Sequence, residues 1–212
     1  MNIKILLKGT ASETLLTVEQ FEGVMGVKYL PRLHYKTPQL RLDIARKTQR
    51  AHSKGRLDRK EQWLGHYYAK EIAQAYHPDV TVAWIDESMG YGVWTNRDIP
   101  AFSYVGEYTG VVRRSYPFRD RDNYYCFDYF VVKTRWSPYF GAPYLIDARD
   151  QSNFTRYINH SDEPNLEPVT AFYDGLPHII LCSKQPIPKG TQLCYDYGPN
   201  YWKKRQPPKP LA

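Results

Sequence analysis

Alternating apolar and polar positions mark most of the chain after residue 80 as strands. Short runs rich in β-branched and aromatic residues are separated there by turn residues such as Gly141, Gly175 and Pro188, a pattern typical of a small β domain. The pattern predicts strands at residues 80–85, 92–95, 102–112, 124–132, 144–148, 169–173, 178–183 and 192–195. We therefore expect this part of the chain to be mostly β.

A helical period precedes the first of these strands. Six residues recur at spacings of three and four, as on one face of an amphipathic helix: Trp63, Leu64, Tyr67, Tyr68, Ile72 and Ala75. The pattern predicts a helix over about residues 58–76, which would cover another part of the fold.

Charge divides the chain at the same place. Residues 1–80 carry 14 Lys+Arg against 8 Asp+Glu, whereas residues 81–212 carry 15 against 14. Within the first part, residues 36–60 hold nine basic side chains and two acids. We interpret residues 1–80 as a basic, partly helical N-terminal region. Its basic segment is either a solvated surface, which we favour slightly, or a contact to DNA through residues 36–60.

Composition excludes several other classes of protein. At 42% hydrophobic residues the chain can fold, yet no stretch approaches the roughly 20 apolar residues of a membrane span, so we expect no membrane partner. Cys126, Cys182 and Cys194 are too few and too widely spaced for a disulfide framework or a zinc site. We expect reduced thiols, no metal, and a cytosolic or nuclear setting.

Three short motifs carry candidate chemistry, although each has an ordinary structural reading. Residues 88–93 (SMGYGV) contain a Gly-x-Gly turn, which on its own also suits a tight hairpin. Residues 156–165 (RYINHSDEPN) are rich in polar groups that also stabilise plain turns. Residues 192–198 (QLCYDYG) resemble the end of a half-buried strand.

The order of these motifs is more specific than any one of them. From about Trp84 to Trp202, the chain resembles the SET-domain protein lysine methyltransferases. The resemblance rests on the Gly-x-Gly turn and on residues 107–110 (EYTG), 124–128 (YYCFD), 144–148 (YLIDA), 156–165 (RYINHSDEPN) and 195–198 (YDYG). The last two elements are the most specific, and chance would not assemble all six at the family's spacing.

The resemblance implies a fold and a division of the chain. SET domains consist of small curved sheets in which two segments cross as a pseudoknot, here preceded by a helical N-terminal region. We therefore expect a SET domain at residues 81–198 and a closing segment and tail at residues 199–212. Many members of the family carry cysteine-rich zinc clusters, which this chain lacks, so no structural zinc is expected.

The resemblance also implies S-adenosyl-L-methionine as the cofactor. Asn159 would contact its methionine end, and backbone atoms near His160 its adenine. The position of Trp202 after the last motif makes it or Tyr201 a candidate lid over the adenine. The family's cofactor positions, with this lid, fall on Met89, Tyr91, Tyr125, Arg156, Asn159, His160 and Trp202.

The remaining family positions form a channel for the substrate lysine. Tyr108, Phe127 and Tyr197 match its lining, and Tyr197 matches the tyrosine usually given the central catalytic role, so the catalytic set is Tyr197, Tyr108 and Tyr195. Asp128 matches an acidic position that holds the substrate peptide. Tyr195 stands where the family has either Phe or Tyr, and Tyr there implies mainly monomethylation.

Methyl transfer explains why aromatic residues suit such a channel. The reaction is an in-line displacement, so the site must align two reactants and exclude water. A free lysine has a pKa of about 10.4, and a desolvated channel beside a sulfonium lowers it. Ring faces attract ammonium and sulfonium groups by about 0.5–2 kcal/mol each, and hydroxyl groups orient the amine. No metal is needed.

These inferences predict a protein-lysine N-methyltransferase, most simply one that acts on a histone tail, a nucleosome or a histone-like protein. Two alternatives stay open: a methyltransferase for non-histone proteins, and a catalytically silent SET module that binds chromatin. A nuclear or chromatin-associated location follows, with the cytoplasm, or a bacterial effector acting in a host nucleus, as alternatives. The residues do not identify the methylated protein.

Overall fold

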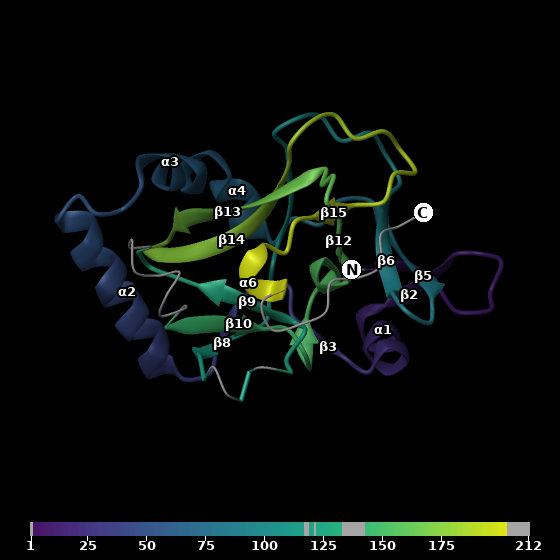
Figure 1. The fold of residues 1–212 in the computed structure, drawn as a ribbon, viewed down its shortest axis with the longest axis horizontal. Coiled ribbons are helices and arrows are strands. Elements are labelled where there is room, and N and C mark those ends of the chain that lie inside the picture. The colour runs from purple at the N-terminus through teal and green to yellow at the C-terminus, as the bar shows by residue number, and fades with distance from the viewer. Residues whose placement is uncertain (1, 117–118, 121, 133–142, 203–212) are drawn as a thin grey trace.

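The computed structural model describes residues 2–116, 119–120, 122–132 and 143–202, except the side chains of Asn200 and Trp202 (Figure 1). The helices are α1 (Val18–Met25), α2 (Pro38–Ser53), α3 (Arg59–Tyr67), α4 (Ala69–Gln74), the 3-10 helix η1 (Phe154–Tyr157) and α6 (Pro199–Trp202). The strands before the middle of the chain are β1 (Asn2–Leu6), β2 (Thr14–Thr17), β3 (Lys28–Tyr29), β4 (His34–Tyr35), β5 (Val80–Asp86), β6 (Gly90–Thr95), β7 (Tyr104–Glu107) and β8 (Val111–Arg114). The later strands are β9 (Cys126–Tyr129), β10 (Tyr144–Asp147), β11 (Gln151–Ser152), β12 (Asn159–His160), β13 (Leu166–Tyr173), β14 (Leu176–Ser183) and β15 (Cys194–Tyr195).

Within the described residues these strands form four small sheets. Their strand orders are β2-β1-β5-β6, β4-β8-β10-β9, β11-β3 and β12-β15-β13-β14-β7. The mostly β fold of small sheets predicted from the sequence is therefore confirmed. The crossing of two segments as a pseudoknot stays a prediction.

Each strand predicted after residue 80 has a counterpart in the structure, but the prediction over residues 102–112 covers two strands. β7 and β8 are separated at Tyr108, Thr109 and Gly110, and they belong to different sheets. A Cβ at Gly110 would lie 2.6 Å from the carbonyl oxygen of Asp147. Only glycine therefore allows the chain to pass so close to β10 as it changes sheets.

The N-terminal region contributes strands that the sequence pattern did not predict. β1 pairs in parallel with β5, with Lys4 opposite Thr81, while β3 pairs with β11 and β4 with β8. Ile3 and Ile5 on β1 are fully buried, so this strand is part of the core. Strands from both sides of residue 80 thus share three of the four sheets.

The predicted helix over residues 58–76 is confirmed as two helices, α3 and α4, which meet at Tyr68. Asp58 caps the start of α3 by accepting hydrogen bonds from the backbone N–H groups of Lys60 and Glu61. Leu64, Tyr68 and Ile72 are buried against the β13–β14 sheet. The predicted amphipathic face is therefore confirmed at these three residues and wrong at Trp63 and Tyr67, which are exposed.

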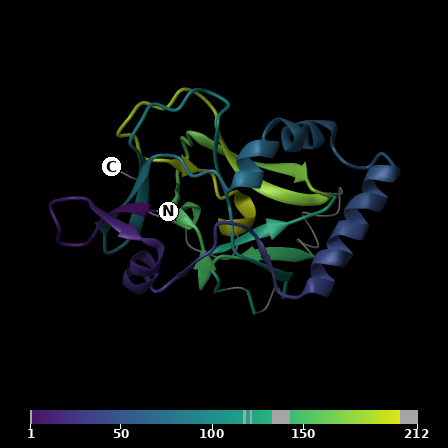
Figure 2. The same ribbon diagram turned by 180° about the vertical axis from the view of Figure 1, so that it is seen from behind.

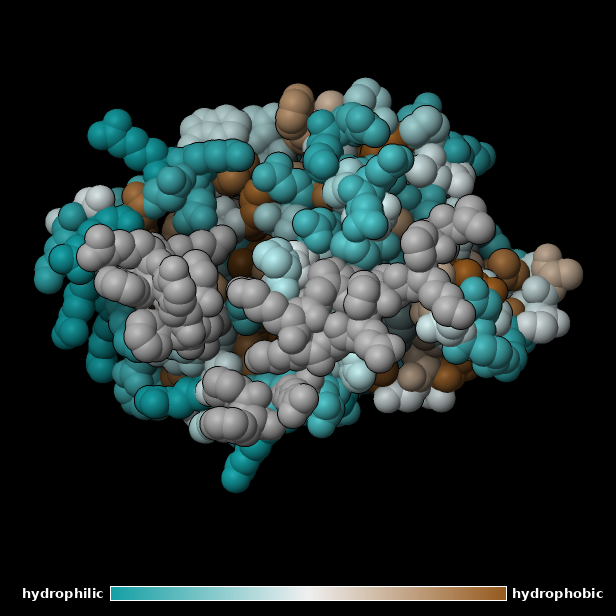
Figure 3. Space-filling view, viewed as in Figure 1, coloured by the Kyte–Doolittle hydropathy of each residue, from teal (hydrophilic) through white to brown (hydrophobic). Residues whose placement is uncertain are grey.

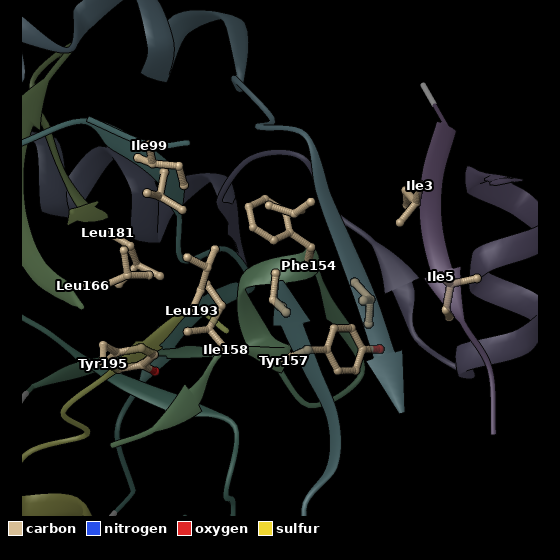
Figure 4. Close-up of a cluster of buried hydrophobic side chains, with 14 of the residues drawn as sticks. Ile3, Ile5, Ile99, Phe154, Tyr157, Ile158, Leu166, Leu181, Leu193 and Tyr195 are labelled. Carbon is tan, nitrogen blue, oxygen red and sulfur yellow. The ribbon is translucent and has the colours of Figure 1, made fainter. Parts of the chain in front are cut away.

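The largest core cluster joins strand β1 to the segment around Tyr195. Figure 4 shows Ile3 and Ile5 on β1 at one side, Phe154 and Ile158 in the middle, and Tyr195 at the other side. Because η1 and the segment after it lie inside this cluster, the polar residues that follow are held by a rigid interior.

The helices occupy two separate regions. α2, α3 and α4 lie near β13 and β14 on one side of the fold, while α1 lies beside β2 on the other, an arrangement that Figure 2 shows from behind. Helix α6 lies between these regions. Among the described residues, no helix is long and apolar enough to cross a membrane.

Candidate active site

The Gly-x-Gly turn is shaped by a single carboxylate. Oδ1 of Asp86 accepts hydrogen bonds from the backbone N–H groups of Ser88 and Met89, at 2.7 and 2.8 Å, and from the Ser88 hydroxyl. The Ser88 side chain, followed by these N–H groups, lowers the pKa of Asp86. The turn therefore leads into β6 in a fixed conformation and presents Met89 and Tyr91 on one side of the sheet.

The polar motif of residues 156–165 is positioned by a capped 3-10 helix. Asn153 caps η1 by accepting from the Thr155 N–H at 3.0 Å, and its amide donates to the carbonyl of Glu107 at 3.0 Å. After η1, Asn159 pairs with Cys194 and His160 with Tyr195 in parallel register. The two most specific motifs of the sequence thus lie side by side.

A row of rings extends from this pairing. The ring centroids of Tyr108 and Phe127 lie 5.3 Å apart, those of Phe127 and Tyr195 6.3 Å, and those of Tyr195 and Tyr197 4.8 Å. Tyr108 comes directly after β7, where its N–H donates to the carbonyl of Ile179 at 2.8 Å. Three distant segments therefore form one aromatic wall.

The rings and the polar motif line one pocket of about 410 Å³, a size typical of small-molecule sites. It brings together ten of the twelve residues predicted as site residues: Met89, Tyr91, Tyr108, Tyr125, Phe127, Arg156, Asn159, His160, Tyr195 and Tyr197. Of the other two, Asp128 does not line it. Asp128 is an exposed residue of β9 next to Phe127, and the Trp202 side chain lies outside the described residues.

Burial keeps the pocket tyrosines neutral. Desolvation raises the pKa of Tyr108, Tyr195 and Tyr197 well above the ordinary value of 10.0, because the charged phenolate is disfavoured in an apolar interior. The Tyr197 hydroxyl donates to the carbonyl of Ile158 at 2.9 Å, and its backbone N–H donates to Nδ1 of His160 at 3.2 Å. One hydrogen bond therefore holds the side chain of Tyr197 and another holds its backbone.

Arg156 is the buried cation of the pocket. Its guanidinium carbon lies 4.0 Å from the ring centroid of Tyr125 and 5.1 Å from that of Tyr157, which are cation–π distances. Its Nε atom is buried and has no hydrogen-bond partner among the described residues. A buried donor without a partner is costly, so this atom is available to a bound polar group.

A buried ion cluster holds the segment that carries Tyr125. Arg113 bonds Asp120 at 2.6 Å and Asp147 at 2.8 Å, and the amide of Asn123 donates to Asp147 at 2.9 Å while its oxygen accepts from the Tyr125 N–H at 3.0 Å. Burial alone would raise the pKa of Asp147, but the hydrogen bonds from Arg113 and Asn123 hold it below its ordinary value. The cluster thus ties the loop before β9 to β8 and β10.

Four further aromatic or sulfur-containing residues line the pocket, of which three were not predicted as site residues. Tyr201 was expected as the alternative to Trp202 for the lid, and Tyr157 lies within the RYINH motif. Tyr124 and Cys126 flank Tyr125, and their position in the pocket depends on how the loop enters β9. The four are Tyr124, Cys126, Tyr157 and Tyr201.

A second hollow, larger and more open at about 660 Å³, lies elsewhere on the surface. Asp79 dominates it, and its oxygens bond Lys4 at 2.7 Å and Arg97 at 3.3 Å. Because Asp79, directly before β5, joins Lys4 on β1 to Arg97 after β6, we interpret it as a structural cross-link. Among the described residues there is no cluster of His, Cys, Asp and Glu that could hold a metal ion.

The chain is similar in sequence to a known protein family. Residues 90–198 match the sequence model of the SET domain. The chain is 37% identical over 122 residues to the mouse histone-lysine N-methyltransferase EHMT1, covering 55% of this chain and 9% of that protein. It is 35% identical over 119 residues to the Caenorhabditis elegans probable histone-lysine N-methyltransferase set-23, covering 51% and 46%.

Among solved structures, Arabidopsis thaliana SUVH6 in complex with S-adenosylmethionine matches with a TM-score of 0.47 and 29% identity. The match covers 56% of this chain and 27% of that chain. The chain spans less than half of the length of EHMT1 and of set-23.

Proposed function

The chain belongs to the SET-domain family, and from this premise we propose that it transfers a methyl group from S-adenosylmethionine to the Nζ atom of a protein lysine. The proposed substrate is a histone or histone-like protein, the class of substrate named for EHMT1 and set-23. The observation that carries the proposal is the convergence of ten predicted site residues in one pocket.

The donor set of the pocket fits the proposed cofactor. The cofactor supplies an activated methyl group on a sulfonium when bound, and its amino acid end bears a carboxylate. Nε of Arg156 is a buried donor in need of an acceptor, and the ring faces of Tyr91 and Tyr125 suit a cation. We propose that Met89, Tyr91, Tyr125, Arg156, Asn159 and His160 hold the cofactor, with Trp202 as a candidate lid.

The aromatic wall is the proposed lysine channel. Water is excluded from the substrate amine by Tyr108, Phe127, Tyr195 and Tyr197. The four ring faces and the neutral tyrosine hydroxyls attract the amine but form no ion pair with it. Desolvation lowers the pKa of an amine, so the channel itself would promote the reactive neutral form. Asp128, exposed beside Phe127, is proposed to hold the substrate peptide.

Tyr195 is proposed to limit the product to one methyl group. Its side chain is 5% exposed, and its ring packs against that of Tyr197, so its hydroxyl occupies space that a methylated amine would need. Mass spectrometry of the product should show a single added methyl, and Tyr195→Phe should add di- or trimethyl product. Abundant trimethyl product from the unchanged enzyme would contradict the idea.

A labelled methyl-transfer assay tests the function itself. Nucleosomes, free histones and total cell lysate are incubated with radiolabelled S-adenosylmethionine, with Tyr197→Phe as the inactive control. We expect label on histones that depends on Tyr197, and we propose a nuclear, chromatin-associated location on the same basis. Label confined to non-histone proteins would contradict the substrate, and cofactor binding without any transfer would indicate a silent module.

A further inference from the structure

Helix α2 carries a row of basic residues on the side facing away from the core. Ile44, Thr48 and Ala51 are its buried residues, whereas Arg46 and Arg50 are exposed, as is the C-cap residue Lys54. These three cations are spaced four residues apart, so they lie on one side of the helix about 6 Å apart along its axis. Figure 3 shows strongly hydrophilic side chains over the α2 edge of the molecule.

The row continues onto the next helix. Arg56, Arg59 and Lys60 are exposed at the connection to α3 and on its first turn. We call this surface the α2–α3 basic face, and it consists of Arg46, Arg50, Lys54, Arg56, Arg59 and Lys60.

The acids of this segment do not neutralise the face. Asp43 accepts a hydrogen bond from Gln39 at 2.8 Å and lies 3.9 Å from Arg46, a loose contact. Asp58 caps α3 and keeps its charge, but over residues 36–60 nine cations stand against only these two acids. Residues 36–60 thus present a strong positive potential, which favours a polyanion.

An exposed aromatic pair lies beside these cations and bears on the kind of polyanion. Trp63 and Tyr67 are 56% and 59% exposed, and their rings stack on each other with centroids 4.7 Å apart and 18° between planes. Unpaired bases stack on ring faces that stand free, and here each ring covers one face of the other. The row of cations instead suits a duplex, whose backbones present a dense and regular array of phosphates.

The basic face is separate from the candidate active site. None of its residues lines the pocket, which is built from β6, η1, β12, β15 and the segments around them. In Figure 1, α2 and α3 lie near β13 and β14, away from β6 and β12. A molecule bound at the face would therefore leave the pocket open.

We propose that the α2–α3 basic face docks duplex DNA through its phosphate backbone, without reading sequence. The proposal goes beyond methyl transfer and does not depend on it. Binding of this kind has a dissociation constant of about 10⁻⁴–10⁻⁶ M at physiological salt and weakens steeply as salt rises.

The test is fluorescence anisotropy with a short, labelled, mixed-sequence duplex and the full chain, without cofactor. Arg50→Gln/Lys54→Gln/Lys60→Gln is compared with Lys28→Gln/Lys184→Gln/Lys189→Gln, which removes the same charge from exposed residues elsewhere. We expect the first variant to bind at least about tenfold more weakly, and its slope of log affinity against log salt to fall by about 2.7, or about 0.9 per lost phosphate contact. The control should stay within about threefold of the wild type.

Several results would overturn the proposal. No binding by the wild-type chain would do so, as would an equal loss in both variants, because net charge alone would then explain the binding. The labelled strand of the same duplex is also tested alone, and tighter binding to this single strand would exclude a duplex site. Equal competition by polyglutamate at the same charge concentration would point to an acidic protein partner instead. Circular dichroism of each variant confirms that it is folded, so each loss of binding is interpretable.

Discussion

The pocket and the α2–α3 basic face use polar groups in opposite ways. The pocket is lined by residues between 88 and 201, and the hydroxyls of Tyr108, Tyr195 and Tyr197 are kept neutral there by desolvation, which raises their pKa. On the basic face, cations project into water from one short stretch of chain. The first arrangement depends on the whole fold, whereas the second depends on two consecutive helices, α2 and α3, being held in place.

This difference implies that chemistry and docking are separable in this protein. A change that loosens the pocket should leave the face intact, and a change that moves α3 should leave the pocket intact. Arg113→Ala and Tyr197→Phe should affect the pocket alone, and Gly65→Ala the face alone.

Arg113→Ala should have the largest effect. It leaves the buried carboxylate of Asp120 without its cation and leaves Asp147 with only the exposed Arg149, at 3.5 Å. Such a loss typically costs about 3–5 kcal/mol of unfolding free energy, measured by urea denaturation. In the folded protein the loop bearing Tyr125 should loosen and cofactor binding weaken, while affinity for duplex DNA is retained. Arg114→Ala, at the exposed neighbouring position, is the control, and equal stability loss in both variants would refute the role of the cluster.

Tyr197→Phe should abolish most of the activity with little change in stability. Losing one positioned hydroxyl in an active site typically lowers the turnover by about 10²–10³-fold, as measured by initial rates of methyl transfer. Tyr76→Phe, at an exposed tyrosine that does not line the pocket, should be silent. A Tyr197→Phe variant that retains most of its turnover would remove Tyr197 from the catalytic set.

Gly65→Ala should disturb the α2–α3 basic face and not the pocket. A Cβ there would lie 1.8 Å from the carbonyl oxygen of Phe172, so α3 must shift away from β13, at a cost of about 1–3 kcal/mol. DNA affinity should fall because α3 carries Lys60, whereas cofactor affinity should not. Gly23→Ala in α1, where a Cβ meets nothing within 4 Å, is the control and should be neutral or slightly stabilising.

The pH profile of the reaction gives the smallest but most specific signal. Because burial raises the pKa of Tyr108, Tyr195 and Tyr197 well above 10.0, these hydroxyls stay protonated as pH rises through that value. The rate should therefore increase with pH as the lysine deprotonates, by up to about tenfold per unit, and then level off. A falling limb below pH 10 in an enzyme that is still folded would show that a pocket tyrosine ionises.

The sequence identified most of the pocket because its residues sit in short motifs whose side-chain types are unusual together. Arg156, Asn159 and His160 follow one another closely in the chain, and Tyr195 and Tyr197 alternate on one strand end. Tyr124 and Cys126 were not predicted, since only the geometry of the loop before β9 brings them to the pocket. The role of Asp128 stays a prediction.

The sequence was least informative in the N-terminal region. β3 and β4 are two residues each, and their partners lie far along the chain, with Lys28 opposite Gln151 and His34 opposite Val111. No local pattern marks such pairs, because tertiary contacts rather than propensity stabilise them. Helix α2 shows the converse: its charge was visible in the composition, but which cations are exposed required the structure.

The most direct test of the central claim is to identify the modified atom. The protein is incubated with a histone mixture and S-adenosylmethionine bearing an isotopically labelled methyl group, and the digested product is sequenced by tandem mass spectrometry. The account predicts the label as a single methyl on the Nζ of a lysine, absent with Tyr197→Phe. Label on arginine or a carboxylate, or label that persists unchanged in Tyr197→Phe, would contradict it.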